Sequence, residues 1–138
     1  NKDFGFNLTI DSGTNFNVQK QSTNFAGFHD EGDGDSGLGY EASLDLANGT
    51  GEQVIYHNTS NDADHSAVGE LFLYNPSSTT FVKHFIGKSN DPQHSNATAN
   101  HFVAGYANTT SAVDGIRFKF DSGNIDAGTI KLYGIKDS

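Results

Sequence analysis

Hydrophobic and polar residues alternate along several short stretches of the chain, a period typical of β-strands. The stretch Phe4–Ile10 places phenylalanine, leucine and isoleucine at every second position, with glycine, asparagine and threonine between them. A period of two puts the apolar side chains on one face, so the pattern predicts a half-buried strand. Gly115–Phe120 repeats the alternation, with arginine and lysine between its apolar residues.

Other strands are predicted by short apolar runs between polar segments. The segment Gly69–Asn75 has apolar residues on both faces, which favours a central strand, and residues 76–80 turn it into a hairpin with Phe81–Gly87. We expect Ser22–Gly39 and Lys88–Asn100 to be polar surface loops. The remaining expected strands are residues 16–20, 53–57, 101–106 and 129–135, and residues 40–46 could form a strand or one helical turn.

These elements predict one all-β domain over residues 1–138. About eight or nine short strands, no helical period and no linker favour an antiparallel β-sandwich of the jelly-roll type. Sixteen glycines and only two prolines suit its many turns. The eleven phenylalanines predict an aromatic core, and we expect five of them to lie mostly within it: Phe81, Phe85, Phe102, Phe118 and Phe120.

The glycine-rich run Asp121–Gly128 lies between two of these predicted strands. Gly123, Asn124 and Gly128 suit the positive φ angles of a turn, so architecture explains this run better than a metal or phosphate site.

Charge and composition exclude several classes of function. A net charge of −9 and a pI of about 4.8 argue against binding to nucleic acid or an anionic membrane, because both need a basic surface. No apolar run approaches the length that spans a membrane. The chain has no cysteine, which excludes disulfides and thiolate chemistry. An acidic surface suits a salty medium, where screening weakens its self-repulsion.

The acidic segment around residues 29–37 is the best candidate for a metal site. Asp30, Asp33 and Asp35 alternate with glycines and offer the hard oxygen ligands that Ca²⁺ prefers. Their spacing is not that of an EF-hand, and a solvated loop is the alternative interpretation. Calcium bound by these three aspartates is therefore the one cofactor hypothesis.

No catalytic motif stands out. The six histidines are scattered without metal-binding spacing, and no G-x-S-x-G sequence occurs. Two carboxylates facing each other in a cleft would still permit glycoside hydrolysis, which leaves a hydrolase as a remote alternative. The chain has no tryptophan, the usual platform for sugars, although its tyrosines could stack on them. We expect a protein that is not an enzyme.

Three stretches together resemble a known family. The segments Leu38–Gly51, Gly69–Phe85 and Gly105–Lys136 are similar to virion structural proteins of marine bacteriophages, whose C-terminal run is of the type "SGNI-x-x-GTIKLYGI", here Ser122–Ile135. The likeness covers about the last hundred residues and is strongest from Gly105 onward. Family members often have more chain upstream, so we expect Asn1 to mark where a longer polypeptide becomes ordered.

The resemblance implies a structural role on the virion surface, with no catalytic residues. It suggests a capsid decoration protein or a tail appendage that contacts major capsid or tail proteins and forms a homo-oligomer, with a trimer favoured. The alternative is a module that binds glycans on the host surface, with calcium at Asp30, Asp33 and Asp35.

Overall fold

The structure is a computed structural model that describes residues 2–135. These residues form nine β-strands and no helix, and every strand pair is antiparallel. The prediction of an all-β fold is therefore confirmed. The strands are β1 (Lys2–Thr9), β2 (Lys20–Asp30), β3 (Ser36–Tyr40), β4 (Ala47–Gly49), β5 (Gln53–Thr59), β6 (Val68–Leu73), β7 (Lys83–Gln93), β8 (Ala97–Ala107) and β9 (Gly115–Phe120).

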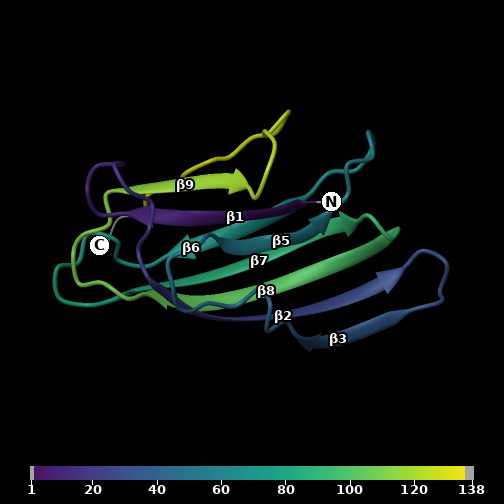
Figure 1. Cartoon of the computed structure of the whole chain (residues 1–138), viewed down its shortest axis with the longest axis horizontal. Coiled ribbons are helices and arrows are strands. Elements are labelled where there is room, and N and C mark those ends of the chain that lie inside the picture. Colours follow the sequence, from purple (N-terminus) through teal and green to yellow (C-terminus); the bar gives the residue numbers. More distant parts are fainter. Residues whose placement is uncertain (1, 136–138) are drawn as a thin grey trace.

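The strands belong to one sheet, in the order β3-β2-β8-β7-β5-β1-β9 (Figure 1). The short β4 pairs with β2, and β6 pairs with β7. The centre of the sheet is made of the three longest strands, β2, β7 and β8, whose residues pair without interruption along eleven positions.

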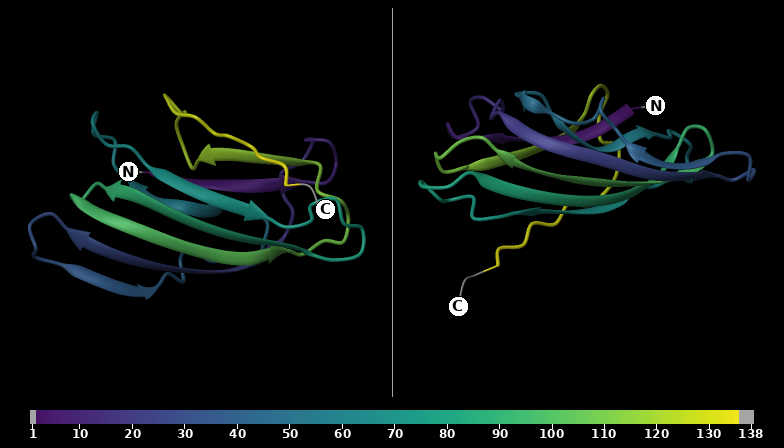
Figure 2. Two further views of the ribbon diagram at one scale, coloured as in Figure 1. Left: turned by 180° about the vertical axis from the view of Figure 1, so that it is seen from behind. Right: turned by 90° about the horizontal axis from the view of Figure 1, so that it is seen from below.

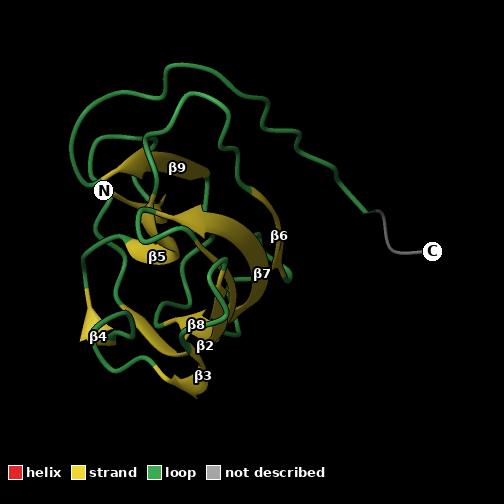
Figure 3. Ribbon diagram, turned by 90° about the vertical axis from the view of Figure 1, so that its right-hand side faces the viewer, coloured by secondary structure: helices red, strands yellow, loops and turns green. Residues whose placement is uncertain are grey.

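The sheet curls so that β1, β5 and β9 lie over β7 and β8 (Figures 1 and 3). β5 joins β7 through a single residue pair, Thr59 with Gln93, so the sheet turns sharply at this corner. In the described part of the chain the sheet is largely open, because β3 and β9 at its two ends do not pair with each other. The structure therefore does not show the antiparallel β-sandwich of jelly-roll type that the sequence predicted.

The core lies between these two parts of the curled sheet. As the alternation predicted, Phe4, Phe6 and Leu8 of β1 are all buried. The opposite face of β1 is covered as well, which the pattern did not predict. Asn7 donates to the carbonyl oxygen of Thr50 and is almost completely buried. The central apolar cluster is formed by Phe6, Leu8, Val18, Phe85, Val103 and Ala107.

The sequence prediction of two long polar loops is wrong. Most of Ser22–Gly39 forms the hairpin of β2 and β3, and most of Lys88–Asn100 forms the hairpin of β7 and β8. Both were missed because the inward positions of these strands carry polar residues. Ser22 and Asn24 of β2 and Ser89 and Asp91 of β7 are buried where a strand pattern would normally show aliphatic side chains.

The predicted hairpin of β6 and β7 is confirmed, with Val68 opposite Asn90 and Leu73 opposite Phe85. β6 is not the doubly covered central strand expected from its sequence. Among the described residues it pairs with β7 alone, and Val68 and Phe72 are exposed.

The chain leaves the sheet after β9. Gly123 and Gly128 have positive φ angles, as predicted, but Asn124 does not. The predicted last strand, residues 129–135, does not join a sheet: it is extended and runs away from the body (Figure 2).

Candidate functional site

The acidic segment forms the tight turn between β2 and β3. An Asp30 carboxylate oxygen accepts a hydrogen bond from the Gly34 amide at 2.8 Å, and Asp33 accepts one from His29 at 3.0 Å between nitrogen and oxygen. No three histidine, aspartate or glutamate side chains within residues 2–135 are grouped so that they could hold a metal ion. The structure gives Asp30 a turn-forming role, and calcium at Asp30, Asp33 and Asp35 stays a prediction.

The outward face of the sheet carries a row of large side chains. Tyr40, Phe25, Phe102, Lys88 and Glu70 lie opposite one another across β3, β2, β8, β7 and β6. Residues directly opposite in antiparallel strands share a face, so the row crosses the whole surface. The rings of Phe25 and Phe102 stack with centroids 5.0 Å apart, and they are 44% and 38% exposed.

This row corrects part of the predicted aromatic core. Phe85 is completely buried, and Phe118 and Phe120 are half-buried at the margin of the core. Phe102 instead lies on the outward row, and Phe81 is 68% exposed in the turn before β7. Phe102 alternates with buried His101 and Val103, so the inward face of β8 is the less aromatic one.

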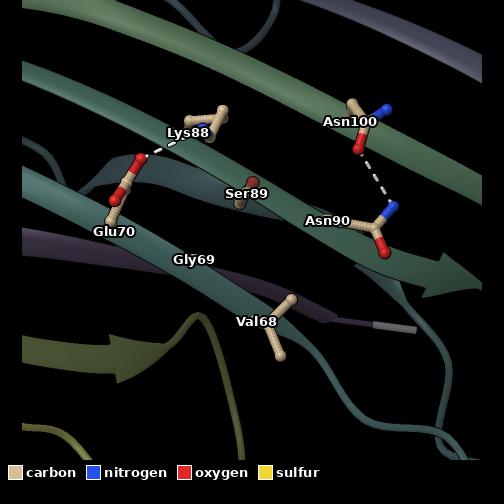
Figure 4. A pocket seen from close by; sticks show the side chains of 7 residues that line it. All are labelled: Val68, Gly69, Glu70, Lys88, Ser89, Asn90 and Asn100. Atoms are coloured by element: carbon tan, nitrogen blue, oxygen red, sulfur yellow. Dashed lines mark hydrogen bonds and ion pairs between the residues drawn. The ribbon is translucent and has the colours of Figure 1, made fainter.

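A polar groove of about 290 Å³ lies at the end of this row (Figure 4). Lys88 and Glu70 form an ion pair at 3.1 Å on one side of it. On the other side, the Asn90 side-chain amide donates to the Asn100 side-chain oxygen at 3.0 Å. Val68 gives the groove an apolar margin. The groove offers donors and acceptors beside an aromatic surface, an arrangement suited to a ligand rich in hydroxyl groups.

A second polar cluster is buried inside the curl of the sheet. Asp91 is completely buried, and its two carboxylate oxygens lie 3.7 Å from the His101 ring nitrogen and 3.2 Å from the Thr59 hydroxyl. The ring of His101 meets that of His57 edge to face, with centroids 6.3 Å apart. His57 in turn contacts Asp3 at 2.9 Å. Four titratable groups from β1, β5, β7 and β8 therefore meet at one place.

Burial shifts the protonation of this cluster. Loss of water raises the pKa of the Asp91 carboxyl to about 7 and lowers the pKa of the His101 imidazole to about 4. Burial therefore shifts both groups toward their neutral forms. One Asp91 oxygen and both His101 ring nitrogens have no hydrogen-bond partner in the structure. This cluster could not be predicted from the sequence, because its residues come from four separate strands. The only indication was that His101 alternates with outward-facing residues of β8 and therefore points inward.

A cavity of about 210 Å³ opens beside the cluster and is lined by His57, His101, Glu41 and Ser95 among others. A histidine oriented by an aspartate is one part of a nucleophilic catalytic site. The hydroxyl of Ser95 makes no hydrogen bond to His57, so the structure holds no assembled nucleophile, base and acid at this place. Asp62 and His65, in the loop between β5 and β6, make only a loose contact at 3.9 Å.

Within residues 2–135, the segment after β9 carries several strongly exposed apolar side chains. Leu132 and Ile135 are each 86% exposed and Tyr133 is 76% exposed. These residues belong to the run on which the resemblance to virion proteins is strongest.

None of residues 2–135 forms a helix long and apolar enough to cross a membrane. Comparison with known proteins found no matching family model, no matching curated protein and no matching solved structure. The resemblance stated from the sequence therefore stays a prediction.

Proposed function

We propose that this chain is a non-enzymatic structural protein on the exterior of a bacteriophage particle, as a capsid decoration protein or a tail appendage. One observation supports the proposal: the run Ser122–Ile135, which lies within the stretch most similar to virion proteins, presents several large apolar side chains to solvent. An exposed apolar stretch on a soluble domain marks a contact with another molecule. Its partners in this role are major capsid or tail proteins and further copies of the chain, with a trimer favoured.

The finer fold belongs to the same proposal. A strand added at an open edge would complete the two-layer jelly-roll sandwich, and residues 129–135 have the alternation of such a strand. The acidic surface, with a net charge of −9, suits a particle exposed to salt water.

Quantitative mass spectrometry of purified particles tests the proposal. The copy number of this chain is measured relative to the major capsid protein. About one copy for each capsid subunit supports decoration, and a few copies for each particle support a tail appendage. If the chain is absent from the particles, the proposed function is wrong.

A second candidate function is binding of host-surface glycans. The outward row supports it, because the stacked Phe25 and Phe102 lie beside the polar groove of Lys88, Asn90 and Asn100. Aromatic faces with nearby amide and charged groups suit sugar rings.

A glycan array followed by calorimetry tests this second function. Phe102→Ala should weaken binding at least tenfold, whereas Phe81→Ala, a matched change at an exposed phenylalanine away from the groove, should not. Calcium dependence through Asp30, Asp33 and Asp35 requires that a chelator lower both the binding and the melting temperature. Equal loss in the two phenylalanine variants would exclude this face as the site.

A further inference from the structure

The segment Thr129–Ile135 has the sequence of a strand, but within residues 2–135 it pairs with no other strand. Its residues alternate, with Ile130 and Leu132 on one side and Lys131 and Tyr133 on the other. Ile130 is 58% exposed and Leu132 is 86% exposed, although such side chains are normally buried. A suitable partner would be a strand with unpaired backbone groups along one edge and apolar side chains beside that edge.

The outer edge of β6 has both properties. Among residues 2–135, β6 forms a ladder with β7 only, so the backbone groups on its other side are free to pair. Leu71 and Leu73 of β6 are half-buried and pack against the central cluster. A neighbouring strand with two leucine-like side chains on its inner face would cover them.

Charge distinguishes this edge from the other open edge nearby, β9. β9 carries Arg117 and Lys119, whereas the single charged residue of β6 is Glu70, a half-exposed carboxylate that Lys88 contacts from the β7 side. The segment brings Lys131. Opposite charges on adjacent strands stabilise the pair and like charges destabilise it, so Lys131 fits β6 better than β9.

Chain direction decides which copy supplies the strand. β9 and β6 run in opposite directions (Figures 1 and 2). A segment that turns back after β9 of the same chain would therefore lie parallel to β6, whereas every ladder in this structure is antiparallel. A second molecule can approach in the antiparallel orientation, which is the slightly more stable one.

We propose that Thr129–Ile135 of one copy adds as an antiparallel strand to the free edge of β6 in a second copy. Strand addition of this kind gives affinity through the backbone and specificity through alternate side chains. The inference rests on the part of the proposed function in which copies of the chain associate. It names the segment and the edge that make the contact.

The absence of cysteine from the chain makes a clean cross-linking test possible. Two single-cysteine variants of the full chain, Glu70→Cys and Lys131→Cys, are mixed and treated with a short bis-maleimide. A covalent dimer is expected in the mixture, at a yield at least fivefold above either variant alone. Adding Leu132→Asp to the Lys131→Cys chain should abolish it, because a buried carboxylate would face Leu71 and Leu73.

The matched control is Lys119→Cys, which places the cysteine on β9 in place of β6. Equal dimer yield with Lys119→Cys would contradict the choice of edge. A double variant, Glu70→Cys with Lys131→Cys, that links only within one chain would show that the segment pairs with its own sheet, and no cross-link at all would also overturn the proposal. The test uses isolated protein, so its failure is distinct from absence of the chain from phage particles.

Discussion

Phe6 of β1 and Phe85 of β7 meet edge to face in the core, with ring centroids 5.2 Å apart and planes at 85°. Neither side chain is exposed to solvent. The two strands are not neighbours in the sheet, so this contact holds its two curled parts together. Edge-to-face aromatic pairs add about 0.5–1.5 kcal/mol beyond the area they bury.

Phe85→Ala should therefore lower the free energy of unfolding by about 3–5 kcal/mol. The substitution leaves a cavity at the point where β1 packs on β7, and the surrounding strands cannot collapse into it. Urea unfolding followed by fluorescence or circular dichroism measures the loss. Phe81→Ala is the control: its side chain is 68% exposed, and its loss should stay below about 1 kcal/mol. Similar losses in the two variants would contradict the central role of Phe85.

Gly105 of β8 should not tolerate a side chain. A Cβ atom there would lie 2.8 Å from the Phe85 ring and 2.9 Å from the Ser22 Cα, and it would overlap the carbonyl oxygen of Gln21. Because Gln21 and Ser22 meet this position with backbone atoms of β2, relief requires the strands to separate. Gly105→Ala should cost about 2–3 kcal/mol in the free energy of unfolding, the range of an overpacked core.

Gly39→Ala provides the comparison for Gly105→Ala. Gly39 lies in the adjacent hairpin strand β3, where an added Cβ would meet nothing within 4 Å. Alanine there should change stability by no more than about 1 kcal/mol. If chemical denaturation gives the two alanine variants the same stability, the close approach of β2 and β8 at Gly105 is wrong.

Much of the sheet could be predicted where apolar side chains fill the inward positions. β1 and β9 have this property, and their alternation indicated them correctly. The hairpin of β6 and β7 was indicated by its two apolar runs and the polar turn between them. Most of β2 and the parts of β7 and β8 next to their connecting turn could not be found this way. The inward positions of β2 and β7 hold Ser22, Asn24, Ser89 and Asp91, and those at the start of β8 hold only small alanines, so a buried face reads as a polar loop.

The candidate sites depended on register rather than on local sequence. Asp30, Asp33 and Asp35 form a visible local pattern, and the structure assigns Asp30 a turn contact. The outward row, by contrast, joins residues from five strands, and the buried cluster joins residues from four. Neither leaves a signal in consecutive residues. Curling of the sheet, which brings β5 over β8, follows from side-chain packing that a single sequence does not display.

Asp30→Ala should destabilise the turn between β2 and β3 by about 0.5–1.5 kcal/mol, the usual net worth of a hydrogen bond. The Asp30 carboxylate holds the Gly34 amide at 2.8 Å, and alanine cannot replace that acceptor. The melting temperatures of the variant and the natural protein are compared in the presence of a chelator, so that no bound metal contributes to the difference. Asp35→Ala, which removes an exposed carboxylate of the same turn, should be nearly neutral. A larger loss in the Asp35 variant would disprove the assigned contact.

Asp91→Asn should make stability depend on pH in a defined way. Because burial raises the pKa of Asp91 from 3.8 to about 7, the folded protein holds one more proton than the unfolded chain between these values. The contribution of Asp91 to stability is therefore complete below pH 4 and is lost as the pH rises to 7. Asparagine does not titrate. The free energy of unfolding of Asp91→Asn, relative to that of the natural protein, should therefore rise by up to about 4 kcal/mol between pH 4 and pH 8.

His101 makes the free energy of unfolding depend on pH in the opposite direction. Its pKa is lowered from 6.5 to about 4 by burial, so between these values the unfolded chain holds the extra proton and stability rises with pH. In the natural protein the pH dependences due to Asp91 and His101 partly cancel. In Asp91→Asn only the contribution of His101 remains, so the stability of this variant should rise with pH. Urea unfolding at pH 4, 5, 6, 7 and 8 measures both curves. Asp62→Asn, an equal charge change at an exposed loop residue, should run parallel to the natural protein. A constant difference between Asp91→Asn and the natural protein would mean that Asp91 is not held neutral in the fold.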